Sequence, residues 1–155
     1  MGYIYYQAPF GKLGLTDQDD KITSLQFYPQ EGQAVVQTTL LREATRQLDL
    51  YFAGKLREFD LPLAPKGTSF QQSVWKALCM IGYGETASYG EIARRIGNAK
   101  ACRAVGMANN RNPIAIFIPC HRIVGSDGSL TGYGGGLDTK RFLLQLETGE
   151  ANETI

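Results

Sequence analysis

The chain has 155 residues, of which 43% are hydrophobic, and its formal net charge is +1. This length and composition predict one folded domain or two small ones and exclude a disordered or fibrous chain. The longest uncharged apolar run, Ile114–Pro119, is far shorter than the ~20 residues of a membrane helix, and the first residues do not resemble a secretion signal. We therefore expect a soluble, cytoplasmic protein without a bilayer segment.

The charges are unevenly distributed along the chain. Residues 1–62 contain six Lys or Arg and eight Asp or Glu, whereas residues 63–155 contain ten and seven. Within the second part, Gly90–Arg111 holds five bases and one acid. This modest basic patch is compatible with nucleic-acid binding, although a solvated helix face would show the same pattern.

The first sixty residues predict a small sheet covered by a helix. Tyr3–Ala8, Lys12–Thr16 and Ile22–Tyr28 are rich in aromatic and β-branched residues and read as antiparallel strands. Apolar residues then recur at helical spacing over Val35–Ala53, and Gly54 follows as a C-terminal cap.

The rest of the chain reads as mainly helical, after a Pro-containing linker at Leu61–Gly67. Thr68 and Ser69 can cap a helix whose core stripe is Phe70, Val74, Leu78 and Ile81. A short helix over Ser88–Ile96, a turn at Gly97 and Asn98, and a helix over Lys100–Asn109 have the layout of a helix-turn-helix. Last come a buried strand at Ile114–Ile118, a Gly-rich loop at Gly125–Gly136 and a helix over Lys140–Glu147 that Asp138 would cap.

These elements predict the fold class and the domains. We expect an α/β (α+β) protein, with a sheet-and-helix domain at 1–62 and a domain carrying a winged helix-turn-helix-like unit at 63–155.

Cys120 is the strongest candidate for a nucleophile among three cysteines. Cys79 and Cys102 lie in helical stripes and read as small apolar residues, and the odd count without paired spacing indicates reduced thiols and no zinc site. Cys120 instead lies between Pro119 and His121, and His121 is the only histidine. Because a free thiol is mostly protonated at neutral pH, Cys120 needs a base, and His121 is the one imidazole available.

The adjacency of Cys120 and His121 poses a geometric problem. Neighbouring side chains on a strand point to opposite faces, so a bridging water or a turn after Pro119 must connect them. A histidine base also needs an orienting partner, usually a carboxylate. Glu147 is the best placed late acid, with a solvated helix-end charge as the alternative.

Several strings occur together, in order and at characteristic spacing, between about Gly67 and Glu147, and with them the chain resembles the 6-O-alkylguanine-DNA alkyltransferases, also called methylated-DNA-protein-cysteine methyltransferases. They are Ser88-Tyr89-Gly90-Glu91-Ile92-Ala93, Arg103-Ala104-Val105-Gly106, Asn112-Pro113, Ile118-Pro119-Cys120-His121-Arg122 and Gly132-Tyr133 with Gly135-Gly136.

The resemblance implies irreversible, single-turnover transfer of an alkyl group from the O6 atom of guanine in DNA to the protein's own cysteine, a form of direct-reversal DNA repair. Cys120 would accept the alkyl group, His121 would activate it through a water, Glu147 would orient His121, and Asn112 would brace the turn. Tyr133, Gly134, Ile123 and Lys140 would form or support the alkylguanine pocket.

The resemblance also implies a mode of DNA binding. Arg103 would enter the base stack of double-stranded DNA and replace the flipped guanine, because the O6 substituent is buried in the duplex. Tyr89 would contact the flipped base or its 3′ phosphate, and the helix would read the minor groove with small residues, among them Ala104, Gly106 and Ala108. No cofactor or metal is implied, and we expect a monomer that can load cooperatively on DNA.

Departures from the family pattern are few. Gly82 follows Ile81 where the family often has proline, so a looser turn is expected, and Gly134 lies beside the pocket tyrosine where some members have a serine. Two alternatives to transfer stay open: a non-catalytic lesion-binding protein, as in alkyltransferase-like proteins that lack the cysteine, and a cysteine hydrolase of acyl groups. The presence of Cys120 disfavours the first, and its adjacency to the sole histidine disfavours the second.

Overall fold

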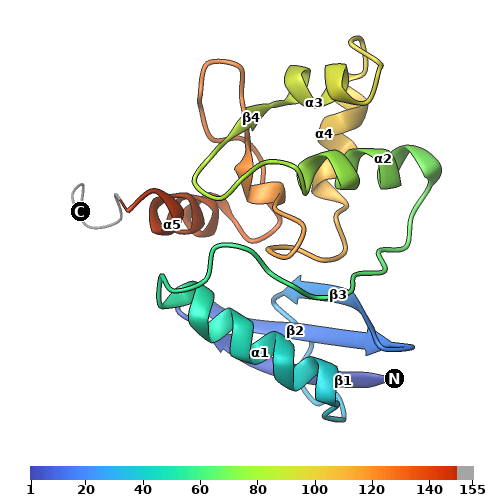
Figure 1. Ribbon diagram of the computed structural model, residues 1–155, viewed down its shortest axis with the longest axis vertical. Coiled ribbons are helices and arrows are strands. Elements are labelled where there is room, and N and C mark those ends of the chain that lie inside the picture. The colour runs from blue at the N-terminus through green and yellow to red at the C-terminus, as the bar shows by residue number, and fades with distance from the viewer. Residues whose placement is uncertain (150–155) are drawn as a thin grey trace. The chain divides into compact units, whose positions relative to one another are not determined.

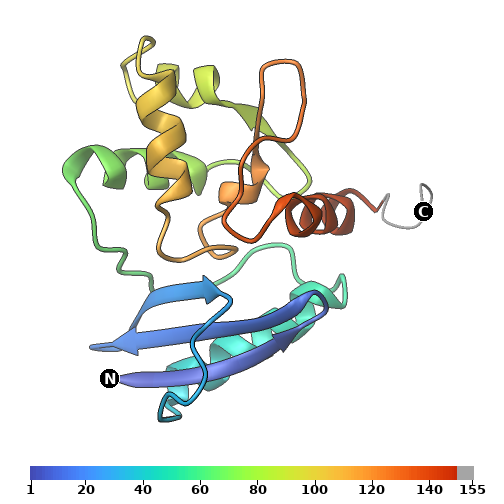
Figure 2. The same ribbon diagram turned by 180° about the vertical axis from the view of Figure 1, so that it is seen from behind.

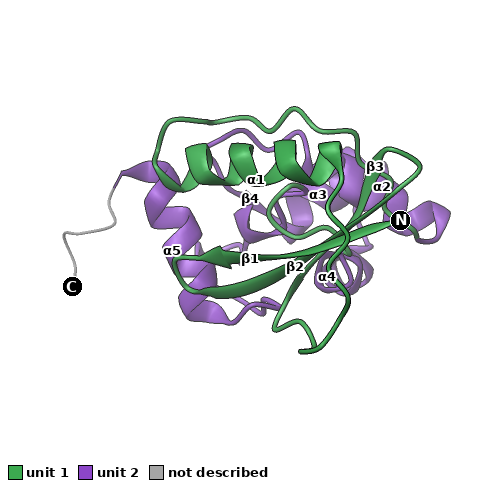
Figure 3. Ribbon diagram, turned by 90° about the horizontal axis from the view of Figure 1, so that it is seen from below, with its two compact units in different colours: residues 1–66, 113–117 green, residues 67–112, 118–155 purple. Residues whose placement is uncertain are grey.

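A computed structural model describes residues 1–149, which form two compact units. Unit 1 comprises residues 1–66 and 113–117, and the described part of unit 2 comprises residues 67–112 and 118–149 (Figure 3). No helix in residues 1–149 combines the length and the apolar character needed to cross a bilayer.

Unit 1 is a three-stranded antiparallel sheet covered by one helix (Figure 1). The strands are β1 (Gly2–Ala8), β2 (Gly11–Gln18) and β3 (Lys21–Phe27), in the order β1-β2-β3, and the helix is α1 (Thr39–Phe52). These elements confirm the predicted sheet and covering helix. Their buried faces meet in a core that includes Leu13, Leu15, Ile22, Leu25, Leu41, Leu48 and Tyr51.

Helix α1 begins later than its apolar pattern predicted. Thr38 caps the helix by accepting from the Leu41 N–H, and Gly54 follows its end with φ 74°, as expected for a glycine at a C-terminal cap. Val36 instead exchanges two backbone hydrogen bonds with Tyr3 and stays exposed. The helical prediction for its first residues was therefore wrong, because strand pairing satisfies their backbone.

Unit 2 packs helices around a short parallel ribbon (Figure 2). It contains α2 (Ser69–Leu78), β4 (Ala87–Ser88), α3 (Tyr89–Arg95), α4 (Cys102–Asn110), the 3-10 turn η1 (Cys120–Arg122), β5 (Ile123–Val124) and α5 (Leu137–Thr148). Two capping boxes, Thr68 with Gln71 and Ser88 with Glu91, fix the starts of α2 and α3. The helix pair α3 and α4 with its turn at Gly97 confirms the predicted helix-turn-helix elements.

Trp75 anchors α2 against α4. Its ring is buried and its Nε1–H donates to the Ala108 carbonyl at 2.8 Å. Gly67 lies against the same ring, and a Cβ there would approach Trp75 Cη2 to 2.4 Å. Of the predicted α2 stripe, Val74, Leu78 and Ile81 are buried, whereas Phe70 is only half-buried.

The buried segment Ile114–Ile118 is not a regular strand. The segment forms isolated bridges, among them that of Ile114 with Leu25, but no ladder, and Ile116 has φ 73°, a conformation that a β-branched residue rarely adopts. The strand prediction was therefore wrong: the apolar run was read correctly as buried but turns too sharply for a ladder. The prediction that Asp138 caps the last helix was also wrong, because the N-cap of α5 is Gly136.

Gly82 does not loosen the turn that follows α2. Its N–H donates to Glu85 Oε1 at 3.1 Å, and its carbonyl accepts from the Glu85 N–H at 3.0 Å. A proline would lack the donor for the first of these bonds. The expectation of a looser turn was therefore wrong, because Glu85 closes it.

Candidate active site and nucleic-acid interface

A tight turn presents Cys120. Pro119 has φ −79° and ψ 63°, and the Cys120 N–H donates to the Ile118 carbonyl at 2.7 Å, which together describe an inverse γ-turn. The three-residue turn η1 follows directly. Because a 3-10 helix has about three residues per turn, Cys120 and His121 project about 120° apart rather than to opposite faces. The turn after Pro119 thus avoids the opposite-face arrangement that a strand would impose.

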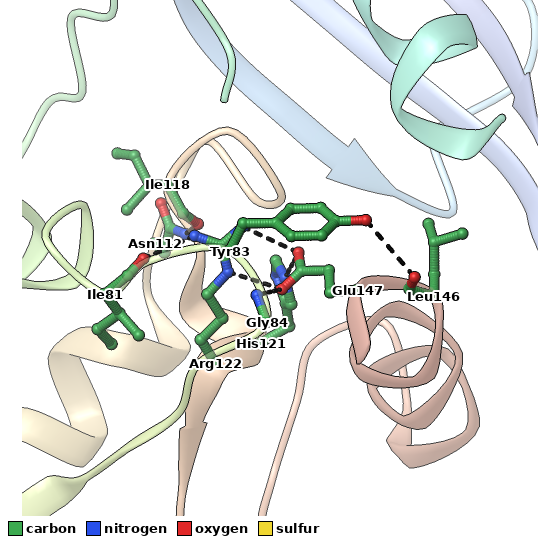
Figure 4. Close-up of polar contacts among 9 residues, drawn as sticks. All are labelled: Ile81, Tyr83, Gly84, Asn112, Ile118, His121, Arg122, Leu146 and Glu147. Carbon is green, nitrogen blue, oxygen red and sulfur yellow. Dashed lines mark hydrogen bonds and ion pairs between the residues drawn. The ribbon is translucent and has the colours of Figure 1, made fainter. Parts of the chain in front are cut away.

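His121 and Glu147 form a buried hydrogen-bonded pair (Figure 4). The His121 side chain is 0% exposed, and its Nε2 lies 2.7 Å from Glu147 Oε2. An ionised carboxylate can only accept, so Nε2 carries the hydrogen and Nδ1 presents its lone pair. Among the described residues Nδ1 has no hydrogen-bond partner. The structure therefore brings together the histidine and the carboxylate that the sequence analysis paired.

Arg122 completes this buried group. Its Nε donates to Glu147 Oε1 at 2.8 Å and its Nη2 to Glu147 Oε2 at 2.9 Å, while Nη1 donates to the Ile81 carbonyl at 2.7 Å (Figure 4). Such a two-bond arrangement is the strongest geometry of an arginine–carboxylate pair. Glu147 is therefore held ionised in place by Arg122 while it orients His121.

The surroundings of His121 keep it neutral. Burial is the main cause that lowers its pKa, and the positive charges of Arg122 and Lys140 lower it further, whereas the bond to Glu147 opposes the shift. A neutral imidazole is the form that can accept a proton. At neutral pH His121 is thus ready to act as a base through Nδ1.

Cys120 is buried beside polar groups that favour its thiolate. Burial raises the pKa of the thiol, while hydrogen bonds from Asn112 and Tyr133 and the charge of Lys140 lower it in part. Asn112 also donates from Nδ2 to the Ile118 carbonyl at 2.9 Å, which ties it to the turn (Figure 4). The net direction is upward, so the resting sulfur is a thiol and needs a base to become a nucleophile.

Lys140 is a buried cation within the electrostatic range of Cys120. Its side chain is fully buried on α5, and Nζ donates to the Thr131 carbonyl at 3.0 Å. Burial lowers the pKa of Lys140 to about 8, with the negative charge of a Cys120 thiolate acting in the opposite direction. Lys140 is thus still largely charged at neutral pH and supports the loop that precedes Tyr133.

The Gly-rich loop Gly125–Gly136 lies against α3. Tyr89 and Thr131 share a hydrogen bond of 2.5 Å between their hydroxyl groups. In this loop Tyr133 is half-buried, and the next residue, Gly134, is exposed; a Cβ added at Gly134 would meet no atom within 4 Å. Ile123 is buried in the β4–β5 ribbon, and its N–H donates to the Cys120 carbonyl. The predicted pocket residues therefore lie on the loop, the ribbon and α5 of one unit.

Helix α4 offers an exposed surface with one free arginine. Arg103 and Ala104 are exposed in its first turn, and Arg103 forms no ion pair within residues 1–149. Gly106 faces the Tyr89 ring, 3.5 Å from Cε1 when a Cβ is added. Ala108 is only 2% exposed, so its side chain lies against the protein interior and not on the surface of the helix that could face DNA. The predicted DNA-reading residues thus share one helix but not one face.

Two residues with clear roles in this geometry had no assigned role in the sequence analysis. Arg122 neutralises Glu147, and Thr131 engages both Tyr89 and Lys140. The available signal for Arg122 was its place directly after His121, one of few cations beside a buried apolar run. Within residues 1–149 no cluster of three or more His, Cys, Asp or Glu could hold a metal ion.

Two family models together match nearly the whole chain. Residues 1–65 match the ribonuclease-like domain of 6-O-methylguanine DNA methyltransferase, and residues 69–149 match its DNA binding domain. A methylated-DNA–protein-cysteine methyltransferase of Methanosarcina acetivorans is 52% identical over 153 residues, covering 95% of this chain and 98% of the relative. The enzyme of that name from Mycobacterium tuberculosis is 49% identical over 154 residues, covering 96% of this chain and 93% of the relative.

Solved structures agree with these sequence matches. The crystal structure of Mycobacterium tuberculosis OGT in complex with DNA superposes with a TM-score of 0.90 at 49% identity, covering 97% of this chain and 95% of that one. An O6-methylguanine DNA methyltransferase from Methanococcus jannaschii gives a TM-score of 0.68 at 30% identity, covering 98% and 95%. The chain belongs to the 6-O-methylguanine DNA methyltransferase family.

Proposed function

We propose that this chain repairs DNA by moving an alkyl group from the O6 atom of guanine onto Cys120. The observation that carries the proposal is the buried arrangement of a thiol beside a neutral histidine whose other nitrogen is bound to a charge-neutralised carboxylate. The family and its named relatives supply the reaction class. The residues supply a way to perform it.

In the proposed reaction the thiol proton moves to His121 Nδ1 through a bridging water. The Cys120 sulfur then attacks the alkyl carbon, so that an S–C bond forms as the C–O6 bond breaks and its electron pair returns to the guanine. The product is a thioether, which has no route back to a thiolate. Each protein molecule therefore acts once.

Tyr133, Gly134, Ile123 and Lys140 are proposed to receive the flipped base, and α4 to enter the minor groove with Arg103 in the vacated base position. Binding in the minor groove fits the small side chain of Ala104 beside Arg103, because small residues let a helix backbone come close to the narrow groove. Tyr89 supports the proposal because it lies between α4 and the Gly-rich loop Gly125–Gly136, called here the pocket loop. The protein is expected to act as a cytoplasmic monomer.

The test is intact mass after incubation with a duplex containing 6-O-methylguanine. We expect one methyl group on the peptide that contains Cys120, no transfer in Cys120→Ser, and normal transfer in the matched variant Cys79→Ser, which changes a more exposed thiol. A protein that binds the lesion duplex but keeps its original mass would instead be a non-catalytic lesion-binding protein. Methylation of Cys79 would contradict the assignment of Cys120.

A further inference from the structure

We propose that a groove between α2 and α4 holds the sugar–phosphate backbone of the DNA strand opposite the lesion. This inference rests on the proposed function and adds a second DNA contact to it. The groove, called here the α2–α4 groove, has a volume of about 230 Å³ and lies within unit 2. It is lined by Thr68, Phe70, Gln71, Ala104, Met107, Ala108 and Arg111.

The groove exists because the side chains of α4 are too small to cover α2 at this point. Ala104 and Ala108 face the first turn of α2 with one methyl group each, which leaves Phe70 half-buried although its helical position predicts a core residue. Met107 is 56% exposed on the adjoining turn. An exposed apolar strip of this kind marks a binding surface more often than a scattered single residue does.

The charge of the groove fits a phosphodiester. Arg111, the C-cap of α4, is exposed at one end, and no described carboxylate pairs with it. The lining residues include no Asp or Glu. Deoxyribose presents an apolar edge and phosphate an anionic one, so Phe70 and Met107 match the sugar and Arg111 matches the phosphate. A surface of this composition would have little affinity for a basic or purely polar partner.

The position of the groove selects the strand. Tyr89 packs against Gly106, while the groove is built on Ala104 and Ala108, which lie about 200° away around α4 from Gly106. A helix inserted in a minor groove has one backbone on each side. Because Tyr89 belongs to the side of α4 that carries the pocket loop, the lesion strand lies there and the opposite strand meets the α2–α4 groove.

Strand-specific neutralisation of phosphates tests this assignment. Cys120→Ser serves as the parent, so that binding to a duplex with one 6-O-methylguanine reaches equilibrium without transfer. Methylphosphonates, which carry no charge, replace phosphates across the minor groove in either strand. Affinity is measured at 50 and 200 mM salt for the parent, for added Arg111→Ala and Arg111→Lys, and for the control Lys76→Ala, an exposed cation of α2 outside the groove.

We expect Arg111→Ala to weaken binding and to reduce the loss of affinity between the two salt concentrations by about 3.5-fold, the share of one phosphate contact. Arg111→Lys should restore most of that salt dependence, and Lys76→Ala should match the parent. Methylphosphonates in the opposite strand should weaken the parent but add little to Arg111→Ala, whereas those in the lesion strand should weaken both equally.

Three results would overturn the proposal. Arg111→Ala could bind with unchanged affinity. The affinity losses caused by Arg111→Ala and by methylphosphonates in the opposite strand could be additive, or the loss caused by Arg111→Ala could instead be non-additive with methylphosphonates in the lesion strand. The first would leave Arg111 as a partner of the α4 dipole, visible as a lower unfolding midpoint alone. Failure of the proposed function is a separate outcome, because it is read from the mass of the wild-type chain and not from binding.

Discussion

Replacing Arg122 with glutamine tests whether the buried Arg122–Glu147 pair governs the active site. The change removes three charge-assisted hydrogen bonds, two to Glu147 and one to the Ile81 carbonyl. It leaves the carboxylate of Glu147, whose side chain is 0% exposed, without its cation. Breaking one partner of such a pair costs about 3–5 kcal/mol, because the remaining charge stays buried. We expect a loss of unfolding free energy of that size in urea titrations.

The same variant should shift the chemistry of His121. Arg122 is one of the charges that lower the pKa of His121, and Glu147 opposes them. Without Arg122 only burial and the charge of Lys140 oppose the negative charge of Glu147, so the pKa of His121 rises. A protonated imidazole cannot accept the Cys120 proton, so transfer to a free alkylguanine base should slow near neutral pH and recover toward higher pH.

Two controls separate the charge effect from loss of contacts. Arg46→Gln removes a pair of the same geometry, with bonds of 2.8 and 2.7 Å to Glu43, but on an exposed surface, so its unfolding midpoint should barely move. The double change Arg122→Gln with Glu147→Gln removes both buried charges and should regain part of the stability. If Arg122→Gln were as mild as Arg46→Gln, or if the double variant lost the sum of both single losses, the reasoning would be refuted.

Two further predictions follow from the buried ionisable groups. Because the pKa of His121 is lowered in the folded state, the unfolded chain binds the extra proton below pH ~6.5, so the contribution of His121 to stability should be constant above that pH and fall by up to about 1.4 kcal/mol per unit below it. Urea titrations between pH 7.5 and 5 should show this slope in the wild type and lose it in His121→Gln, the sole histidine; an unchanged slope would assign it elsewhere. Lys140→Met removes a charge that lowers the pKa of Cys120, so alkylation of Cys120 by iodoacetamide should shift to higher pH, and an unmoved profile would argue against the electrostatic role.

The elements that sequence reasoning predicted well carry local signals. The Thr68 and Ser88 capping boxes and Gly54 after α1 are each encoded within a few residues of the helix end that they fix. The strands of unit 1 likewise follow from short hairpins. The strand prediction for Ile114–Ile118 failed because an apolar run shows burial but not hydrogen-bond partners, and the bridge of Ile114 to Leu25 is not local.

The active site divides in the same way. Cys120 and His121 are adjacent, so their association is visible in the sequence, and the helical position of Glu147 made it a candidate. The two bonds of Arg122 join residues 25 positions apart, and the contact of Thr131 with Tyr89 joins residues 42 apart. Such pairs depend on how α5 and the pocket loop pack, which no local pattern specifies. The half-burial of Phe70 is of this kind too, because it depends on the alanines of α4.

The charges around Cys120 resolve an apparent conflict in the proposed mechanism. Burial raises the pKa of the thiol and lowers that of His121, so each group alone resists ionisation. Proton transfer, however, creates both charges at once: a thiolate within the field of Lys140, and an imidazolium bonded to Glu147. Each new charge thus forms beside a fixed opposite one, in a site where electrostatic interactions are strong because water is largely excluded. Once the sulfur is alkylated, the thiolate that Lys140 favours can no longer form. The same preorganised charges then have no nucleophile to stabilise, so a second substrate cannot react.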